Sequence, residues 1–403
     1  MHQVSPRAGS GSSLSTGRRN IASTNAPTSP HLAAGVRGRH TASMTFDPDG
    51  PALAAAGPYG LPDTLDDASA IIVPVPFEAT VSFGTGTMHG PAAIALASHQ
   101  VDLLDADMGH VYRCGIAMED APAWLVALND DTRIAATRVI EAHTAGVVPD
   151  RADLAAVDAA GDRVNAHVHE RVADLLARGK LPVVVGGDHS VPLGAIVACA
   201  RHLGDKPLGI LHLDAHLDLR DAYEGFRWSH ASIMKNVLDA VPTARLVQFG
   251  IRDFSRGELD LVRDNPGRIT TYFDSQLRDA RLRGRFLEAS QAIVAALPDD
   301  VYLSFDIDGL DPVLCPSTGT PVPGGLSFDE LVSVLVLLSQ SGKRVVGLDL
   351  VEVAPPGEAD DDDARADCWD ANVGARLLYK MIGCAQRTRG VVFDEPLPRP
   401  PGL

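Results

Sequence analysis

The chain has few cysteines, few aromatic residues and no long apolar run. Its five cysteines stand far apart among 403 residues, and no two of them form a CxxC pair. This spacing argues against a disulfide framework and predicts a reducing compartment, which we expect to be the cytoplasm. No stretch of about 18 consecutive apolar residues occurs, so the sequence predicts no membrane-spanning helix and no membrane partner.

Basic residues are also scarce. There are 35 Lys and Arg against 52 Asp and Glu, which gives a formal net charge of −17 at pH 7. This balance argues against nucleic acid as a partner, because nucleic-acid binding depends on neutralising phosphates with Lys and Arg. An acidic protein can attract cationic ligands or divalent metals, although acidity also simply keeps a protein soluble.

The first 45 residues lack acidic residues altogether and are rich in Ser, Thr, Gly, Ala, Pro and Arg. Such a segment cannot bury enough apolar surface to offset its chain entropy, so we predict a disordered tail over residues 1–45. Two alternatives remain: an organelle transit peptide, or a start codon placed too early, with Met44 as the true first residue. We expect a single domain over residues 46–390 and a Pro-rich tail over residues 391–403.

From Ala70 onward, short apolar runs alternate with amphipathic stretches. Runs that are apolar at consecutive positions are typical of strands buried on both faces, and strand–helix alternation predicts a parallel sheet covered on both sides. The expected strands are Ala70–Val75, Leu181–Val185, Leu208–Leu213, Leu246–Phe249, Val301–Phe305 and Val345–Leu350. The expected helices are Asp153–Ala177, Val191–Leu203, Phe328–Ser339 and Ala371–Met381. In such sheets, ligands bind beyond the carboxyl ends of the strands.

Three of these strands end in clusters of Asp and His. The clusters are Gly186-Gly187-Asp188-His189-Ser190, then Asp214-Ala215-His216-Leu217-Asp218, and finally the run from Ser304 to Pro312 that holds Asp306 and Asp308. Alternate side chains on extended backbone lie on one face, so the members of each cluster can converge. A single Asp or His at a strand end could merely cap the next helix. Three such clusters together would repel one another unless a cation lay between them, so they predict a metal centre.

The number of ligands indicates how many ions this centre holds. Four carboxylates (Asp214, Asp218, Asp306 and Asp308) and two imidazoles (His189 and His216) are too many for one ion and suit two ions about 3.5–4 Å apart. No thiolate lies near them in sequence, which argues against a closed structural zinc site. Oxygen-rich ligation with some imidazole favours Mn²⁺, with Co²⁺, Ni²⁺ or Zn²⁺ also possible.

The motifs GGDHS, DAHLDLR and SFDIDGLDP, in this order, resemble the metal-binding signatures of the arginase/agmatinase (ureohydrolase) family. The resemblance runs from about Ala70 to Cys384 and includes the segments at Gly84–Pro91, Gly319–Pro321 and Asp349–Pro355. It implies a three-layer α/β/α sandwich on a mostly parallel, doubly wound sheet of eight strands, and a homo-oligomer, either a trimer or a hexamer. It also implies the distribution of ligands: His189, Asp214, Asp218 and Asp306 for one ion, and Asp214, His216, Asp306 and Asp308 for the other.

Two further residues take roles from the same resemblance. Glu352 stands where the family holds the guanidinium of a small guanidino substrate. A carboxylate suits this role because its two oxygens can accept two parallel N–H groups of the guanidinium. His230 stands at the place of a proton-shuttling histidine, although Ala231 replaces the more common Gly after it. The implied mechanism is attack on the guanidino carbon by a hydroxide that the two metals activate. Asp308 would act as a proton acceptor as well as a ligand, and His230 would help to protonate the leaving amine.

Arg220 leaves the substrate open. It stands where arginases resembling this chain usually have an Asn that holds a carboxylate, and the segment Asp218–Gly225 looks agmatinase-like. We therefore expect hydrolysis of agmatine to putrescine and urea, with Arg220 paired to Asp221 or Glu224. If Arg220 instead meets a substrate carboxylate, the chain would be an arginase, a guanidinobutyrase or guanidinopropionase, or a formiminoglutamase. A single-metal deacetylase-like enzyme and a non-catalytic relative are more remote alternatives, because none of the ligands is missing.

Overall fold

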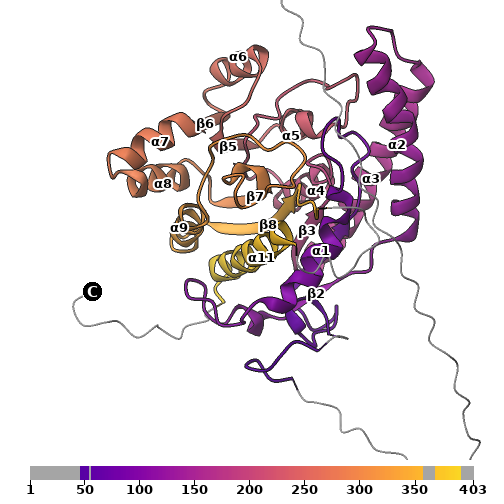
Figure 1. Ribbon diagram of the computed structural model, residues 1–403. Helices are drawn as coiled ribbons and strands as arrows, with labels where there is room; N and C mark the ends of the chain where they lie inside the picture. The colour runs from indigo at the N-terminus through magenta and orange to yellow at the C-terminus, as the bar shows by residue number, and fades with distance from the viewer. Residues whose placement is uncertain (1–45, 54–55, 357–367, 392–403) are drawn as a thin grey trace, which may run out of the picture. The chain divides into compact units, whose positions relative to one another are not determined.

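The computed structural model describes residues 46–53, 56–356 and 368–391. The expected tails at residues 1–45 and 392–403 lie outside these ranges. The described part of the chain forms three layers, with helices on both faces of a central sheet (Figure 1).

Eight strands form the sheet, and every pairing between neighbours is parallel. In chain order they are β1 (Ala70–Val75), β2 (Ile116–Met118), β3 (Leu181–Gly186), β4 (Leu208–Leu213), β5 (Arg245–Ile251), β6 (Ile269–Phe273), β7 (Asp300–Asp306) and β8 (Arg344–Val351). Their order across the sheet is β2-β1-β3-β8-β7-β4-β5-β6. The expected doubly wound α/β fold with about eight strands is thus confirmed, and the sheet is wholly parallel where a mostly parallel one was expected.

Each face of the sheet has its own hydrophobic core. One core joins the sheet to α1 (Gly90–Ala97), α7 (Asp274–Leu282), α8 (Phe286–Ala295), α9 (Phe328–Ser339) and α11 (Trp369–Thr388). The other joins it to α3 (Arg151–Ala177), α4 (Leu193–Leu203), α5 (Ile233–Ala240) and α6 (Arg256–Asp264). The long helix α2 (Ala123–Thr144) packs against α3 on the outside of this second layer (Figure 1).

The two cores explain why the strands are apolar at consecutive positions. Alternate side chains of a strand point to opposite faces. In β4, Ile210 therefore enters one core and Leu211 the other, and both are fully buried.

A helix start such as that of α9 is set locally, because Ser327 accepts a hydrogen bond from the backbone of Glu330 while Glu330 accepts one from the backbone of Ser327.

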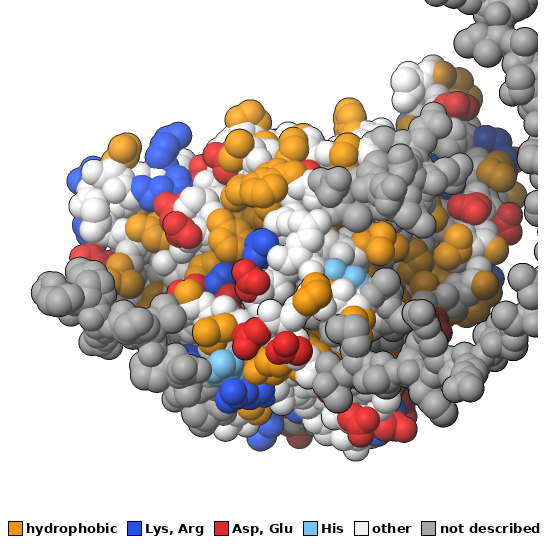
Figure 2. All heavy atoms as spheres, turned by 60° about the horizontal axis from the view of Figure 1, so that its bottom comes forward, with side chains coloured by type: hydrophobic (Ala, Val, Ile, Leu, Met, Phe, Trp, Pro, Cys, Tyr) orange, Lys and Arg blue, Asp and Glu red, His pale blue; other side chains and the backbone are white. Residues whose placement is uncertain are grey.

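Four of the five cysteines are buried, and Cys114 is partly exposed. All five cysteines are free. Within the described ranges, no helix is long and apolar enough to cross a membrane. On the face shown in Figure 2, acidic and basic side chains are interspersed with apolar ones.

Candidate active site

The polar motifs meet because their strands are neighbours. Strands β3, β8, β7 and β4 are consecutive in the middle of the sheet. All strands are parallel, so their carboxyl ends lie at one edge, and the segments beginning at Gly187, Glu352, Asp306 and Asp214 lie side by side there. Residues that are 163 positions apart in sequence are thereby brought into direct contact: the backbone N–H of His189 donates to Glu352 Oε1 at 2.9 Å.

Two groups of ligating atoms form at this edge. In the first, His189 Nδ1 lies 3.0 Å from Asp214 Oδ2 and 3.3 Å from Oδ2 of both Asp218 and Asp306. In the second, His216 Nδ1 lies 3.4 Å from Asp214 Oδ1 and 3.2 Å from Asp308 Oδ2.

Asp214 therefore presents one oxygen to each group, as expected of a carboxylate that bridges two ions. Asp306 had the same expected role, but the structure places it in the first group only, since its Oδ1 accepts the backbone N–H of Asp308 at 2.8 Å. All six predicted ligands thus lie in the two groups.

The electrostatics of the two groups fit divalent cations. Burial raises the pKa of the Asp306 carboxyl well above its usual range, and Asp308 and Asp214 raise it further. Burial, followed by the charge of Asp214, raises the pKa of Asp218 to about 7. Burial alone would lower the pKa of His216, but Asp308 and Asp214 outweigh it and raise this pKa to about 12. Burial and the mutual repulsion of the carboxylates thus favour bound protons on Asp306 and Asp218, and cations at the same points would replace these protons.

Glu352 follows β8 in a left-handed conformation, with φ of 61°. This conformation is uncommon for a residue other than glycine, and the surrounding contacts hold it. Its N–H donates to Gly187 O at 2.9 Å, and its own carbonyl accepts the Thr318 hydroxyl at 2.9 Å. A Cβ added at Gly319 would lie 3.5 Å from Glu352 Oε2, within ordinary van der Waals contact of this oxygen. The carboxylate therefore lies beside Gly319, at the wall of the pocket described next.

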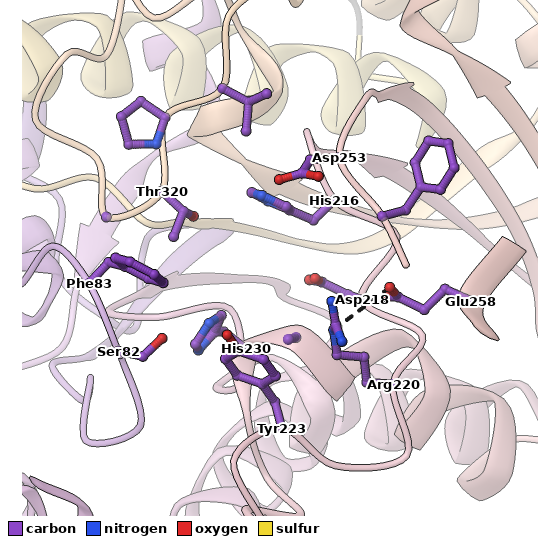
Figure 3. Close-up of a pocket in the computed structure, with 15 residues that line it drawn as sticks. Ser82, Phe83, His216, Asp218, Arg220, Tyr223, His230, Asp253, Glu258 and Thr320 are labelled. Carbon is purple, nitrogen blue, oxygen red and sulfur yellow. Dashed lines mark ion pairs between the residues drawn. The ribbon is translucent and has the colours of Figure 1, made fainter. Parts of the chain in front are cut away.

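A pocket of about 360 Å³ opens beside the ligand groups, and its lining includes His216 of the second group and Asp218 of the first. In Figure 3 the side chains of His216, Asp218 and His230 lie around the cavity, with Phe83 and Thr320 on its far side. His230 begins a short 3₁₀ helix (His230–Ser232) that Ser229 caps, so the Ala that follows His230 is accommodated. Burial, followed by the charge of His216, lowers the pKa of His230 to about 4. This imidazole is therefore neutral at pH 7.

Arg220 also lines this pocket, but its partner differs from both that were expected. Its Nε lies 3.7 Å from Glu258 Oε2, and its guanidinium lies over the Tyr223 ring at 5.1 Å (Figure 3). Pairing with Asp221 or Glu224 was wrong. Asp221 is an exposed residue that pairs with Lys235 instead. Glu258, although far away in sequence, lies in the first turn of α6, directly beside the pocket.

Sequence reasoning missed two sets of residues. The first is His212 and the polar residues that flank it inside the sheet. His212 Nε2 lies 2.9 Å from Asp214 Oδ2, and its position two residues before Asp214 was the available signal. The second set lines the pocket and consists of Phe83, Tyr223, Asp253, Phe254 and Glu258. These residues come from loops and from the start of α6, where sequence patterns carry little information.

A wholly parallel α/β sandwich with two carboxylate–imidazole groups at its carboxyl edge fits the class of hydrolases that hold divalent metals at such an edge. The sequence profile of the Arginase family matches residues 68–383, so the chain belongs to that family. It is a ureohydrolase, a hydrolase that acts on the C–N bonds of linear amidines.

Two relatives illustrate the likeness in sequence. The N(1)-aminopropylagmatine ureohydrolase of Synechocystis sp. is 30% identical over 79% of this chain and 89% of its own length. The agmatinase of Bacillus anthracis is 30% identical over 72% of this chain and 86% of its own length. Among solved structures, the agmatine ureohydrolase of Thermoplasma volcanium has a TM-score of 0.60 at 22% identity, covering 81% of this chain and 93% of that one. At this identity the structural likeness supports the fold alone.

Proposed function

We propose that the chain holds two divalent cations, Mn²⁺ foremost, and hydrolyses agmatine to putrescine and urea. The observation that carries the substrate is the charge of the pocket. Among the described residues that line the pocket, Arg220 is the one Arg or Lys. It already forms an ion pair with Glu258 and a cation–π contact with Tyr223. Asp253, on the pocket wall near His216, forms no ion pair with any described residue (Figure 3). A substrate tail that ends in an ammonium group suits these surroundings better than one that ends in a carboxylate.

Each residue of the site has a part in this proposal. Divalent ions held by the two groups would acidify water and so supply the nucleophile at neutral pH. Glu352 holds the guanidinium through a charge-assisted hydrogen bond, and its burial keeps competing water away. Asp308 accepts a proton from the nucleophile. His230, neutral at pH 7, relays a proton from solvent in the pocket through its ring to the departing amine.

A second candidate substrate is N(1)-aminopropylagmatine. The relative from Synechocystis carries this activity in its name, and the pocket has room at its mouth, where Phe83 is 73% exposed. A longer cationic tail would lie along Phe83 and Phe254, because an aromatic face attracts a cation. This substrate has the same guanidino end as agmatine and makes the same demands on the metal groups.

The test is kcat/KM for the full chain loaded with Mn²⁺, measured for each substrate in turn. Urea release is followed for agmatine, N(1)-aminopropylagmatine, arginine, guanidinobutyrate and guanidinopropionate, and glutamate release for formiminoglutamate. We expect the highest value for agmatine. A higher value for N(1)-aminopropylagmatine would select the second candidate, and a preference for any carboxylated substrate would refute both. Metal analysis tests the centre separately: two ions per chain are expected, and one or none would contradict the proposal.

A further inference from the structure

A row of polar side chains crosses the sheet beneath the two ligand groups, with one residue on each of five neighbouring strands. Backbone pairing joins Thr271 to Gln248, Gln248 to His212, His212 to Ser304, and Ser304 to Asp349. Residues paired in this way on parallel strands point to the same face, which here is the face covered by α3, α4 and α5. Gln248, His212, Ser304 and Asp349 are each 0% exposed.

One half of this row ends on Asp214. The Thr271 hydroxyl donates to Gln248 Oε1 at 3.2 Å, so the Gln248 amide nitrogen faces the other way. That nitrogen donates to Leu217 O and to His212 Nδ1, at 2.9 Å in each case. An amide NH₂ can only donate, so His212 Nδ1 must be the acceptor, and the ring proton lies on Nε2. His212 Nε2–H then donates to Asp214 Oδ2 at 2.9 Å.

The other half of the row ends on His189. The Ser304 hydroxyl donates its one proton to Asp349 Oδ1 at 3.1 Å. It must therefore accept from His189 Nε2, which lies 3.1 Å away. This leaves His189 Nδ1 with a lone pair, pointing at the oxygens of Asp214, Asp218 and Asp306. A lone pair facing three carboxylate oxygens is the arrangement that a cation requires.

Packing alone does not account for the row. Burying polar groups costs free energy, and hydrogen bonds offset this cost only when the donors and acceptors are paired. Apolar side chains at these positions would avoid the cost altogether. Both hydrogen-bonded chains instead end on a candidate ligand. His212 lies within ligating distance of His189, Asp214 and Asp218, but both of its ring nitrogens are already used.

We propose that Gln248, His212, Ser304 and Asp349 are positioning residues that fix the tautomer of His189 and the orientation of Asp214 for metal binding. His212 is accordingly a hydrogen-bond donor to a ligand and not itself a ligand. The inference rests on the metal centre of the proposed function and is independent of which substrate is hydrolysed. Such outer partners hold ligands in the geometry that a metal requires, and removing one typically weakens metal affinity about 10- to 100-fold.

The experiment is a titration of the chelator-treated full chain with Mn²⁺, without substrate, in which free Mn²⁺ is measured by its electron paramagnetic resonance signal. Gln248→Leu removes the amide that donates to His212 Nδ1, so the ring proton of His212 is no longer fixed on Nε2. Ser304→Ala removes the second connection, and Ser304→Thr retains its hydroxyl. We expect Gln248→Leu and Ser304→Ala to lower Mn²⁺ affinity by about 10- to 100-fold, and Ser304→Thr to retain it.

Val247→Ala is the matched control, because Val247 lies next to Gln248 on β5, is equally buried and faces the opposite core. It should lower thermal stability and leave Mn²⁺ affinity unchanged. If a core variant does not fold, Thr271→Val at the half-buried end of the row replaces it, with a smaller but measurable loss of affinity expected.

Mn²⁺ affinity equal to that of the unaltered chain in Gln248→Leu, Ser304→Ala or Thr271→Val would overturn the positioning role and leave the proposed function intact. An unaltered chain that binds no Mn²⁺ would overturn the metal centre as well.

Discussion

Arg220 offers the sharpest test of the proposed substrate class. Its side chain is 38% exposed, and its Nε–Oε2 separation of 3.7 Å from Glu258 exceeds a hydrogen bond. Ion pairs this exposed contribute about 0–1 kcal/mol to stability. Glu258 would remain satisfied without it, since the backbone of Leu219 and both the backbone and hydroxyl of Ser255 donate to its carboxylate. Replacing Arg220 by Gln should therefore leave the fold intact.

The effect of Arg220→Gln on kinetics depends on the substrate tail. If the tail is cationic, Arg220 makes no attractive contact with it, and KM for agmatine should change by less than about tenfold, or 1.4 kcal/mol. If the tail is a carboxylate that Arg220 holds, the loss of the charge-assisted hydrogen bond should cost about 1.5–3 kcal/mol of transition-state binding. This loss should lower kcat/KM roughly 10- to 150-fold.

Steady-state urea release with agmatine and with guanidinobutyrate distinguishes the two cases. Arg256→Gln is the matched control, because Arg256 is 78% exposed on α6 and pairs with Asp260, away from the pocket lining. A loss above tenfold that is confined to the carboxylated substrate would refute the agmatine proposal. It would leave the hydrolysis of a guanidino group untouched, because Glu352 and the two ligand groups do not involve Arg220.

Three further predictions concern other parts of the molecule. His216→Ala should leave one weakly held ion and lower kcat by several orders of magnitude with the fold retained; two tightly bound ions by metal analysis would contradict the ligand assignment. A chain that begins at Met44 should keep its specific activity, and a large fall in kcat would assign a role to the preceding residues. Burial raises the pKa of Asp370 to about 6. The folded state thus holds this proton more tightly than the unfolded chain, and the associated stability, present below about pH 4, is lost as pH rises to about 6. Asp370→Asn should therefore raise the unfolding free energy at pH 7, by at most about 3 kcal/mol, and leave it unchanged at pH 4; equal stability of the two chains in urea at both pH values would contradict this reasoning.

The sequence predicted the central strands well, and it placed the candidate metal ligands at their ends, for a common physical reason. A strand buried on both faces must be apolar throughout, so the change to Asp and His at its end is abrupt. Strands β3, β4, β7 and β8 show this change, and their bounds were predicted to within two residues. The edge strands β2 and β6 were missed, because Ile116–Met118 is only three residues long and Ile269–Phe273 is partly exposed with Thr at its centre.

The surroundings of the ligands were harder to predict. The pairing of Arg220 with Glu258 joins a loop after β4 to the start of α6. Neither local sequence indicates that the two residues lie close together. Gln248 stands in an apolar strand, where a lone polar residue is equally consistent with an error in strand assignment, and Thr271 stands in a strand that was missed. Their proposed role in positioning His212 follows only from the strand register across β4, β5 and β6, which places them in one row with His212.

The central position of the four ligand-bearing strands has a consequence for how the molecule opens. Strands β3, β8, β7 and β4 have neighbours on both sides, whereas β2 and β6 form the edges of the sheet. Backbone amides in the central four should exchange with solvent deuterium only when the whole domain unfolds, and those of the edges should exchange through local fraying. A cation that binds only the folded chain stabilises it in proportion to the logarithm of its concentration. Metal loading should therefore slow exchange across the entire centre of the sheet, far from any ligating atom, and leave β2 and β6 almost unaffected.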